Sequence, residues 1–75
     1  MEFKIYIYMK PWSEDQIIYK TFDAAERACR QDGLIEEWTC SASSDRFALT
    51  NSWQRIGKEM VRQFDGTAAP LEFEE

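Results

Sequence analysis

The segment from Ile17 to Cys40 constrains the fold most strongly, because its pattern is that of a strand, a short helix and a second strand. Asp23 and, three residues later, Glu26 predict the N-terminal cap of the helix, since both carboxylates can accept hydrogen bonds from free amides there. Gly33 predicts where the helix ends, because glycine readily adopts the left-handed conformation found at helix C-termini. The apolar residues at helical spacing are small, which predicts a helix of about two to three turns lying close against a sheet: Ala25, Ala28 and Cys29.

The segment from Glu2 to Lys10 predicts a strand, because its residues alternate strictly between two kinds of side chain. Pro11 ends this strand, since proline has no amide to donate to a sheet. Similar but shorter patterns predict strands at residues 16–21, 34–41 and 46–50. In the first strand one face carries Phe3, Ile5, Ile7 and Met9, and the other carries Lys4, Tyr6, Tyr8 and Lys10.

A second helix is predicted from Asn51 or Ser52 to Phe64, ending at Gly66, because large apolar residues recur there at helical spacing. Gly57 inside it costs about 1 kcal/mol relative to alanine, which suggests a close approach of another backbone. We therefore predict an α+β two-layer sandwich of order ββαββα, with a four-stranded, mainly antiparallel sheet and two helices on one face. The expected core is Phe3, Ile5, Ile7, Trp38, Phe47, Leu49, Trp53, Ile56 and Met60.

Composition and charge limit the functional class. The 75 residues predict one domain over residues 1–66, followed by an acidic tail, 67–75, which holds three of the acids behind the net charge of −5. There is no histidine, no phosphate-binding loop and no close pair of cysteines, so we expect no enzyme, no metal and no cofactor. Cys29 and Cys40 are interpreted as two buried thiols. No signal peptide or membrane span is predicted, and we expect a cytoplasmic protein.

Aromatic side chains are the first candidates for partner binding. Trp12 follows Pro11 in a loop and is the best single candidate for a contact anchor, although it can instead fold over the sheet edge. Tyr6 and Tyr8, flanked by lysines, could stack bases and hold phosphates as sheet-based single-strand binders do. An amphipathic face turned to solvent is the simpler interpretation of the same residues.

Charged side chains are the second group of candidates. The acidic residues could meet a basic groove, or serve only for solubility: Glu14, Asp15, Glu36 and Glu37. The basic residues would align on the outer face of the second predicted helix, where Glu59 could pair with them and leave an ordinary solvated surface: Arg55, Lys58 and Arg62.

These features favour a small non-enzymatic protein that binds another protein as an inhibitor or adaptor. Its size and charge are analogous to those of phage and mobile-element accessory proteins, including anti-CRISPR-type inhibitors of nucleic-acid machinery, but no residue carries that analogy. The alternative is a single-stranded nucleic-acid-binding domain that uses Tyr6 and Tyr8. Homodimerisation through sheet edges or the tyrosine face is compatible with either function.

Overall fold

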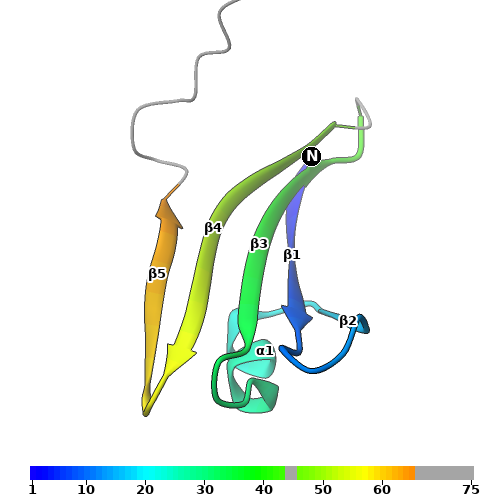
Figure 1. Cartoon of the computed structure of the whole chain (residues 1–75). Helices are drawn as coiled ribbons and strands as arrows, with labels where there is room; N and C mark the ends of the chain where they lie inside the picture. The colour runs from blue at the N-terminus through cyan, green and yellow to red at the C-terminus, as the bar shows by residue number, and fades with distance from the viewer. Residues whose placement is uncertain (44–45, 66–75) are drawn as a thin grey trace, which may run out of the picture.

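A computed structural model describes residues 1–43 and 46–65 of the chain. These residues form a five-stranded antiparallel sheet with the strand order β2-β1-β3-β4-β5, and one short helix packs against one end of it (Figure 1). The predicted acidic tail lies outside the described residues, as do Asp45 and Gly66. In chain order the elements are β1 (Glu2–Met9), β2 (Gln16–Tyr19), α1 (Phe22–Ala28), β3 (Leu34–Ser41), β4 (Arg46–Ile56) and β5 (Glu59–Asp65).

The predicted fold class is wrong, because the second helix expected from Asn51 or Ser52 to Phe64 is a β-hairpin. Over the described residues the chain is mainly β, with five strands and one helix. Ile56 pairs with Glu59 across a two-residue turn in which Gly57 has a φ of 65°. A positive φ at the first central residue of a two-residue loop matches the twist of hairpin strands. Gly57 therefore serves the turn, and an added Cβ there would meet nothing within 4 Å.

The helix α1 is present, but its boundaries differ from those predicted. Thr21 is the N-cap, and its hydroxyl accepts a hydrogen bond from the amide of Ala24, so Asp23 lies in the first turn instead. The helix ends at Ala28 and is capped by Cys29, whose amide donates to the carbonyl of Glu26, so it ends before the predicted Gly33. A hydroxyl at the position just before the first turn can satisfy a free amide as well as a carboxylate can.

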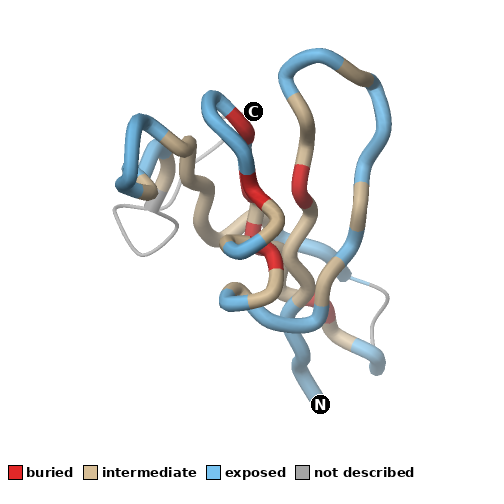
Figure 2. Tube along the Cα trace, turned by 90° about the horizontal axis from the view of Figure 1, so that it is seen from below, coloured by how far each residue is buried: buried red, intermediate tan, exposed pale blue. Residues whose placement is uncertain are grey.

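The core lies between α1 and the tyrosine-bearing face of β1, which we call the helix-side face. Its buried residues are Tyr8, Ala25, Cys29 and Ile35. Gly33 is part of the same packing, because an added Cβ would lie 2.7 Å from the Tyr8 ring. Buried residues are few, and they occur as short, separate segments of the chain (Figure 2).

The orientation of the sheet is therefore opposite to the one predicted. Phe3 is 49% exposed and Phe47 is 67% exposed, although both were expected in the core. Trp53 and Met60 do pack against the core, because they lie on the helix-side face and not on the face of Phe3 and Phe47. The helix packs on the tyrosine face, where it contacts aromatic rings and where the segment after it finds a polar partner. The Tyr8 hydroxyl accepts a hydrogen bond from the amide of Arg30 at 3.1 Å.

Candidate functional site

The sheet has a second face that α1 does not cover, and we call it the open sheet face. Alternation along the paired strands places large apolar side chains on it from all five strands, including Val61 and Phe64 of the edge strand β5. Ile18 is 63% exposed there, and Leu34 and Val61 are also exposed. An apolar patch that crosses a whole sheet marks an interaction surface. Its principal residues are Phe3, Ile5, Ile7, Met9, Ile18, Leu34, Trp38, Phe47 and Leu49.

The open sheet face carries acidic charge and, in its three long central strands, no basic charge. Glu36 lies on β3, opposite Ile7 on one side and Ser52 on the other. Its carboxylate accepts a hydrogen bond from the indole N–H of Trp38 at 3.0 Å. Strand alternation puts every lysine and arginine of β1, β3 and β4 at the strand ends or on the helix-side face. The face is therefore apolar with one half-buried anion near its middle.

Glu37, the next residue, points to the helix-side face and is only 6% exposed. The Tyr6 hydroxyl donates to its Oε2 at 2.9 Å, and Thr50 Oγ1 and Asn51 Nδ2 each donate to its Oε1 at 2.7 Å. Lys4 Nζ lies 3.7 Å from the same oxygen. Both β4 donors reach one oxygen because the register shifts opposite Glu37, which inserts Thr50 as an extra residue. Glu37 is thus a fully partnered structural carboxylate.

The network shifts the pKa values of two of its members. Burial alone would raise the pKa of the Glu37 carboxyl, but hydrogen bonds from Thr50, Asn51 and Tyr6 and the charge of Lys4 together hold it below the usual 4.5. For Tyr6, burial, the hydrogen bond to Glu37 and the negative charge of Glu37 all raise the pKa, from 10.0 to about 12. The native fold therefore favours an ionised Glu37 beside a neutral Tyr6.

These shifts predict how stability depends on pH. Because the native pKa of Glu37 lies below 4.5, its contribution is fully present above that pH and is lost as the pH falls through the native value. The raised pKa of Tyr6 has the opposite sign: its contribution is fully present below pH 10.0 and is lost as the pH rises through about 12. Urea unfolding across this range should show that Glu37→Gln weakens the acid dependence and Tyr6→Phe weakens the alkaline one. Unchanged pH slopes in both variants would contradict the assignment.

The structure separates most of the residues predicted to bind a partner. Trp12, Glu14 and Asp15 are exposed in the loop between β1 and β2. Glu36 and Glu37, which the sequence presents as one acidic pair, lie on opposite faces of the sheet. The acidic residues therefore do not form one surface.

The basic stripe predicted from a helical Arg55, Lys58 and Arg62 is wrong, because that helix is absent. The Arg55 guanidinium donates to the carbonyls of Glu26 at 3.0 Å and of Lys58 at 3.2 Å, so it ties β4 to α1. Lys58 is in the hairpin turn, and the Arg62 guanidinium lies 5.8 Å from the centre of the Trp53 ring. Glu59 begins β5 opposite Ile56, which removes the helical pairing expected for it.

Tyr6 and Tyr8, the tyrosines of the predicted nucleic-acid face, make contacts within the protein. Tyr8 is 2% exposed in the core beneath α1. The Tyr6 ring packs edge-on against Phe22, with 6.0 Å between ring centres, while its hydroxyl binds Glu37. Tyr8 is therefore closed to solvent, whereas the half-buried Tyr6 ring is already in contact with Phe22.

The sequence did contain a signal for the open sheet face. Both faces of β1 are built from large side chains, and Ile17 and Ile18 are adjacent, so one of the two must face away from the core. The one helix of the described residues packs on the tyrosine face, so it leaves the opposite face without a helix over it.

No family model, curated protein or solved structure matches this chain. Over residues 1–43 and 46–65, no group of three or more histidine, cysteine or carboxylate side chains is placed to hold a metal ion. Within the same residues no helix has the length and hydropathy needed to cross a membrane. Cys29 and Cys40 are both buried and unbridged, as interpreted from the sequence, and strand pairing and packing put them on opposite faces of the sheet.

Proposed function

We propose that the chain is a protein-binding module whose open sheet face docks onto an apolar surface of a larger protein. The observation that carries the proposal is the exposure of Phe3, Ile18 and Phe47 on one face of the sheet, over which the described residues place no second layer. Sheets bury a hydrophobic face against another layer, and here that layer comes from a partner.

The size of the face suits a protein partner. The five strands have 8, 4, 8, 11 and 7 residues, so at about 3.3 Å per residue and about 4.8 Å between strands they cover on the order of 600 Å² of flat area. One side of a standard protein interface buries about 800 Å² of accessible surface. Packing between such faces leaves about 10 Å between sheets, which is filled by side chains of the size found here.

Charge favours a different protein over a second copy of this chain. Glu36 lies near the middle of the open sheet face, and a two-fold copy would bring two such carboxylates into one apolar interface. Burying like charges together is costly, whereas a lysine or arginine of a partner would pair with Glu36. Proteins that handle nucleic acids are rich in such cations, so a role as inhibitor or adaptor of a nucleic-acid-handling complex fits this chemistry.

The test compares variants of the open sheet face with matched variants elsewhere. Phe47→Ser and Ile18→Ser should keep the stability within about 0.5 kcal/mol, because both side chains are exposed. Each should weaken capture of a stoichiometric partner from lysate by about tenfold or more. Trp12→Ser, which removes a side chain of similar exposure (61%) from outside this face, should not weaken capture.

The charge part of the proposal has its own pair of variants. Glu36→Lys should abolish capture, whereas Glu14→Lys, the same reversal in the exposed loop, should not. Light scattering on the purified chain supplies the competing outcome. A dimer that dissociates on Phe47→Ser would assign the face to a second copy and overturn the proposal, and so would partner capture that survives both open-face serine variants.

A further inference from the structure

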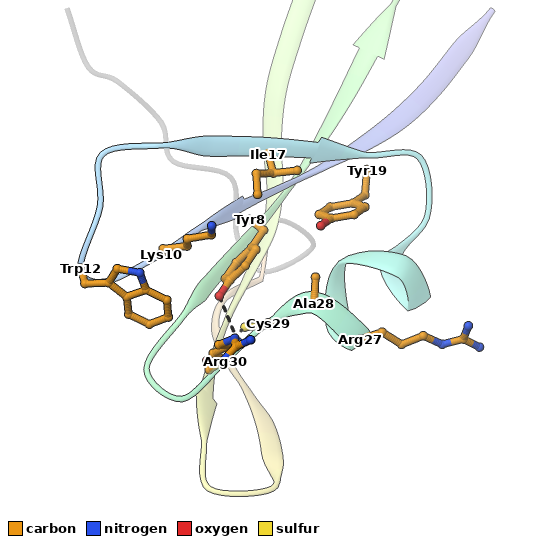
Figure 3. Close-up of a pocket in the computed structure, with 9 residues that line it drawn as sticks. All are labelled: Tyr8, Lys10, Trp12, Ile17, Tyr19, Arg27, Ala28, Cys29 and Arg30. Atoms are coloured by element: carbon orange, nitrogen blue, oxygen red, sulfur yellow. Dashed lines mark hydrogen bonds between the residues drawn. The ribbon is translucent and has the colours of Figure 1, made fainter.

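A cavity of about 640 Å³ lies on the helix-side face, between the loop that follows β1 and the end of α1 (Figure 3). Trp12 and Lys10 come from the loop side, Ile17 and Tyr19 from β2, and Arg30 from the segment after the helix. The volume is within the range of about 300–1,000 Å³ that small-molecule sites occupy. The open sheet face is on the other side of the sheet, so this cavity is separate from the proposed protein interface.

The lining of the cavity is basic in a chain that is acidic overall. Its lining residues include Lys10, Arg27 and Arg30, and none of the described residues that line it carries a carboxylate. Arg27 pairs with Asp23 at 3.5 Å and is directed away from the other labelled residues (Figure 3). Over the described part of the chain, Lys10 and Arg30 have no ion-pair partner. Two uncompensated cations thus face one cavity.

Aromatic rings supply the second property of the cavity. Trp12 is a loop side chain with its indole at the cavity, and Tyr19 lines the opposite part from β2 (Figure 3). The base of the cavity is fixed, because the amide of Arg30 donates to the Tyr8 hydroxyl and the amide of Gly33 donates to the carbonyl of Arg30 at 2.9 Å. One ligand can therefore stack on an aromatic ring and bind a cation at the same time, and the floor of the cavity is already formed before it binds.

We propose that this cavity binds a small anionic aromatic molecule. Its ring would stack on Trp12, and its acid group would lie within reach of Lys10 and Arg30. Stacking on an aromatic side chain and charge-assisted hydrogen bonds are the two interactions by which proteins hold nucleotides and aryl acids. A phosphate and a carboxylate share this chemistry, and the experiment separates them.

Isothermal titration calorimetry on the full chain tests the proposal with four probes: adenosine monophosphate, indole acetate, adenosine and inorganic phosphate. The expected result is that at least one of the first two binds about tenfold or more tightly than both adenosine and phosphate, since only they combine a ring with an acid group. Tighter binding of the monophosphate assigns a phosphate ligand, and tighter binding of indole acetate assigns a carboxylate. No heat from any probe up to about 10 mM would overturn the proposal.

Variants locate the binding. Lys10→Gln, Arg30→Gln and Trp12→Ala should each weaken the best probe by about tenfold, the effect of losing one charged hydrogen bond or one stacked ring. Arg46→Gln is the matched control, because Arg46 is exposed at the start of β4, at the end of the sheet away from α1 (Figure 1). Equal weakening by Arg46→Gln would show a general charge effect and overturn the proposal. Chemical-shift changes of the Trp12 indole N–H on adding the probe provide a readout that needs no variant, and their absence counts against the site.

Discussion

Replacing Glu37 by alanine should lower the free energy of unfolding by about 3–5 kcal/mol, because it removes a buried carboxylate and leaves three half-buried donors without their acceptor. Tyr6, Thr50 and Asn51 each donate to this carboxylate, and Lys4 lies 3.7 Å from it. A domain of this length has a total stability of roughly 4–11 kcal/mol, so the loss is a large part of the whole. Chemical denaturation of Glu37→Ala against the wild type measures it.

The isosteric change Glu37→Gln distinguishes shape from charge at this position. A glutamine can still accept from Thr50 and Asn51 but loses the charge, so we expect a smaller loss of about 1–2 kcal/mol. Glu36→Ala is the matched control, since Glu36 is half-buried and accepts one hydrogen bond, from Trp38. Its expected loss is about 1 kcal/mol or less. Equal losses for Glu36→Ala and Glu37→Ala would contradict a special role for the Glu37 network.

The sequence predicts the first part of the fold well, because its local signals agree with one another. The strict alternation of Glu2 to Lys10, and the small apolar residues of the helix, gave β1 and α1 with boundaries shifted by a few residues. Pro11 does lie just beyond the first strand. In this region the hydrophobic period and the turn residues favour the same structure, although the helix is capped by Thr21 and Cys29 and not at Asp23 and Gly33.

The second part could not be predicted, because its pattern fits two structures. Trp53, Ile56, Met60 and Phe64 are spaced as on a helix, yet they also fit two strands that meet at Gly57. Tertiary contacts decide between the two structures, because β4 pairs with β3 from Arg46 to Gln54. Beyond that, the amide of Arg55 donates to the carbonyl of Gly33 and the carbonyl of Arg55 accepts from the amide of Asp32, both at 2.9 Å. Such long-range pairing leaves no local signal in the sequence. The one local feature that fits a hairpin is Gly57 as the first residue of a two-residue turn, and the residue after it can be of many kinds.

The candidate sites were harder to predict than the fold, because they depend on which face of the sheet meets α1. Strand alternation assigns residues to two faces but does not say which face is covered. Trp12 was singled out from the sequence, and it does line a cavity. The two cations of the same cavity could not be recognised from the sequence, because Lys10 and Arg30 are far apart along the chain and line one cavity only in the folded structure.

The Tyr8 ring organises that covered face, so its removal should have the second largest effect on stability. Tyr8→Ala deletes the largest side chain of the buried cluster, between α1 and Ile35, and should cost about 3–5 kcal/mol. Tyr8→Phe keeps the ring but leaves the amide of Arg30 without its acceptor, and should cost about 1–2 kcal/mol.

Tyr19→Phe is the matched control for Tyr8→Phe, because the Tyr19 hydroxyl has no hydrogen-bond partner among the described residues. It should change the free energy of unfolding by no more than about 0.5 kcal/mol. Thermal and urea unfolding of the three variants measure these differences. If Tyr8→Ala is no less stable than Tyr19→Phe, the helix does not pack on the tyrosine face, and the assignment of the open sheet face falls with it.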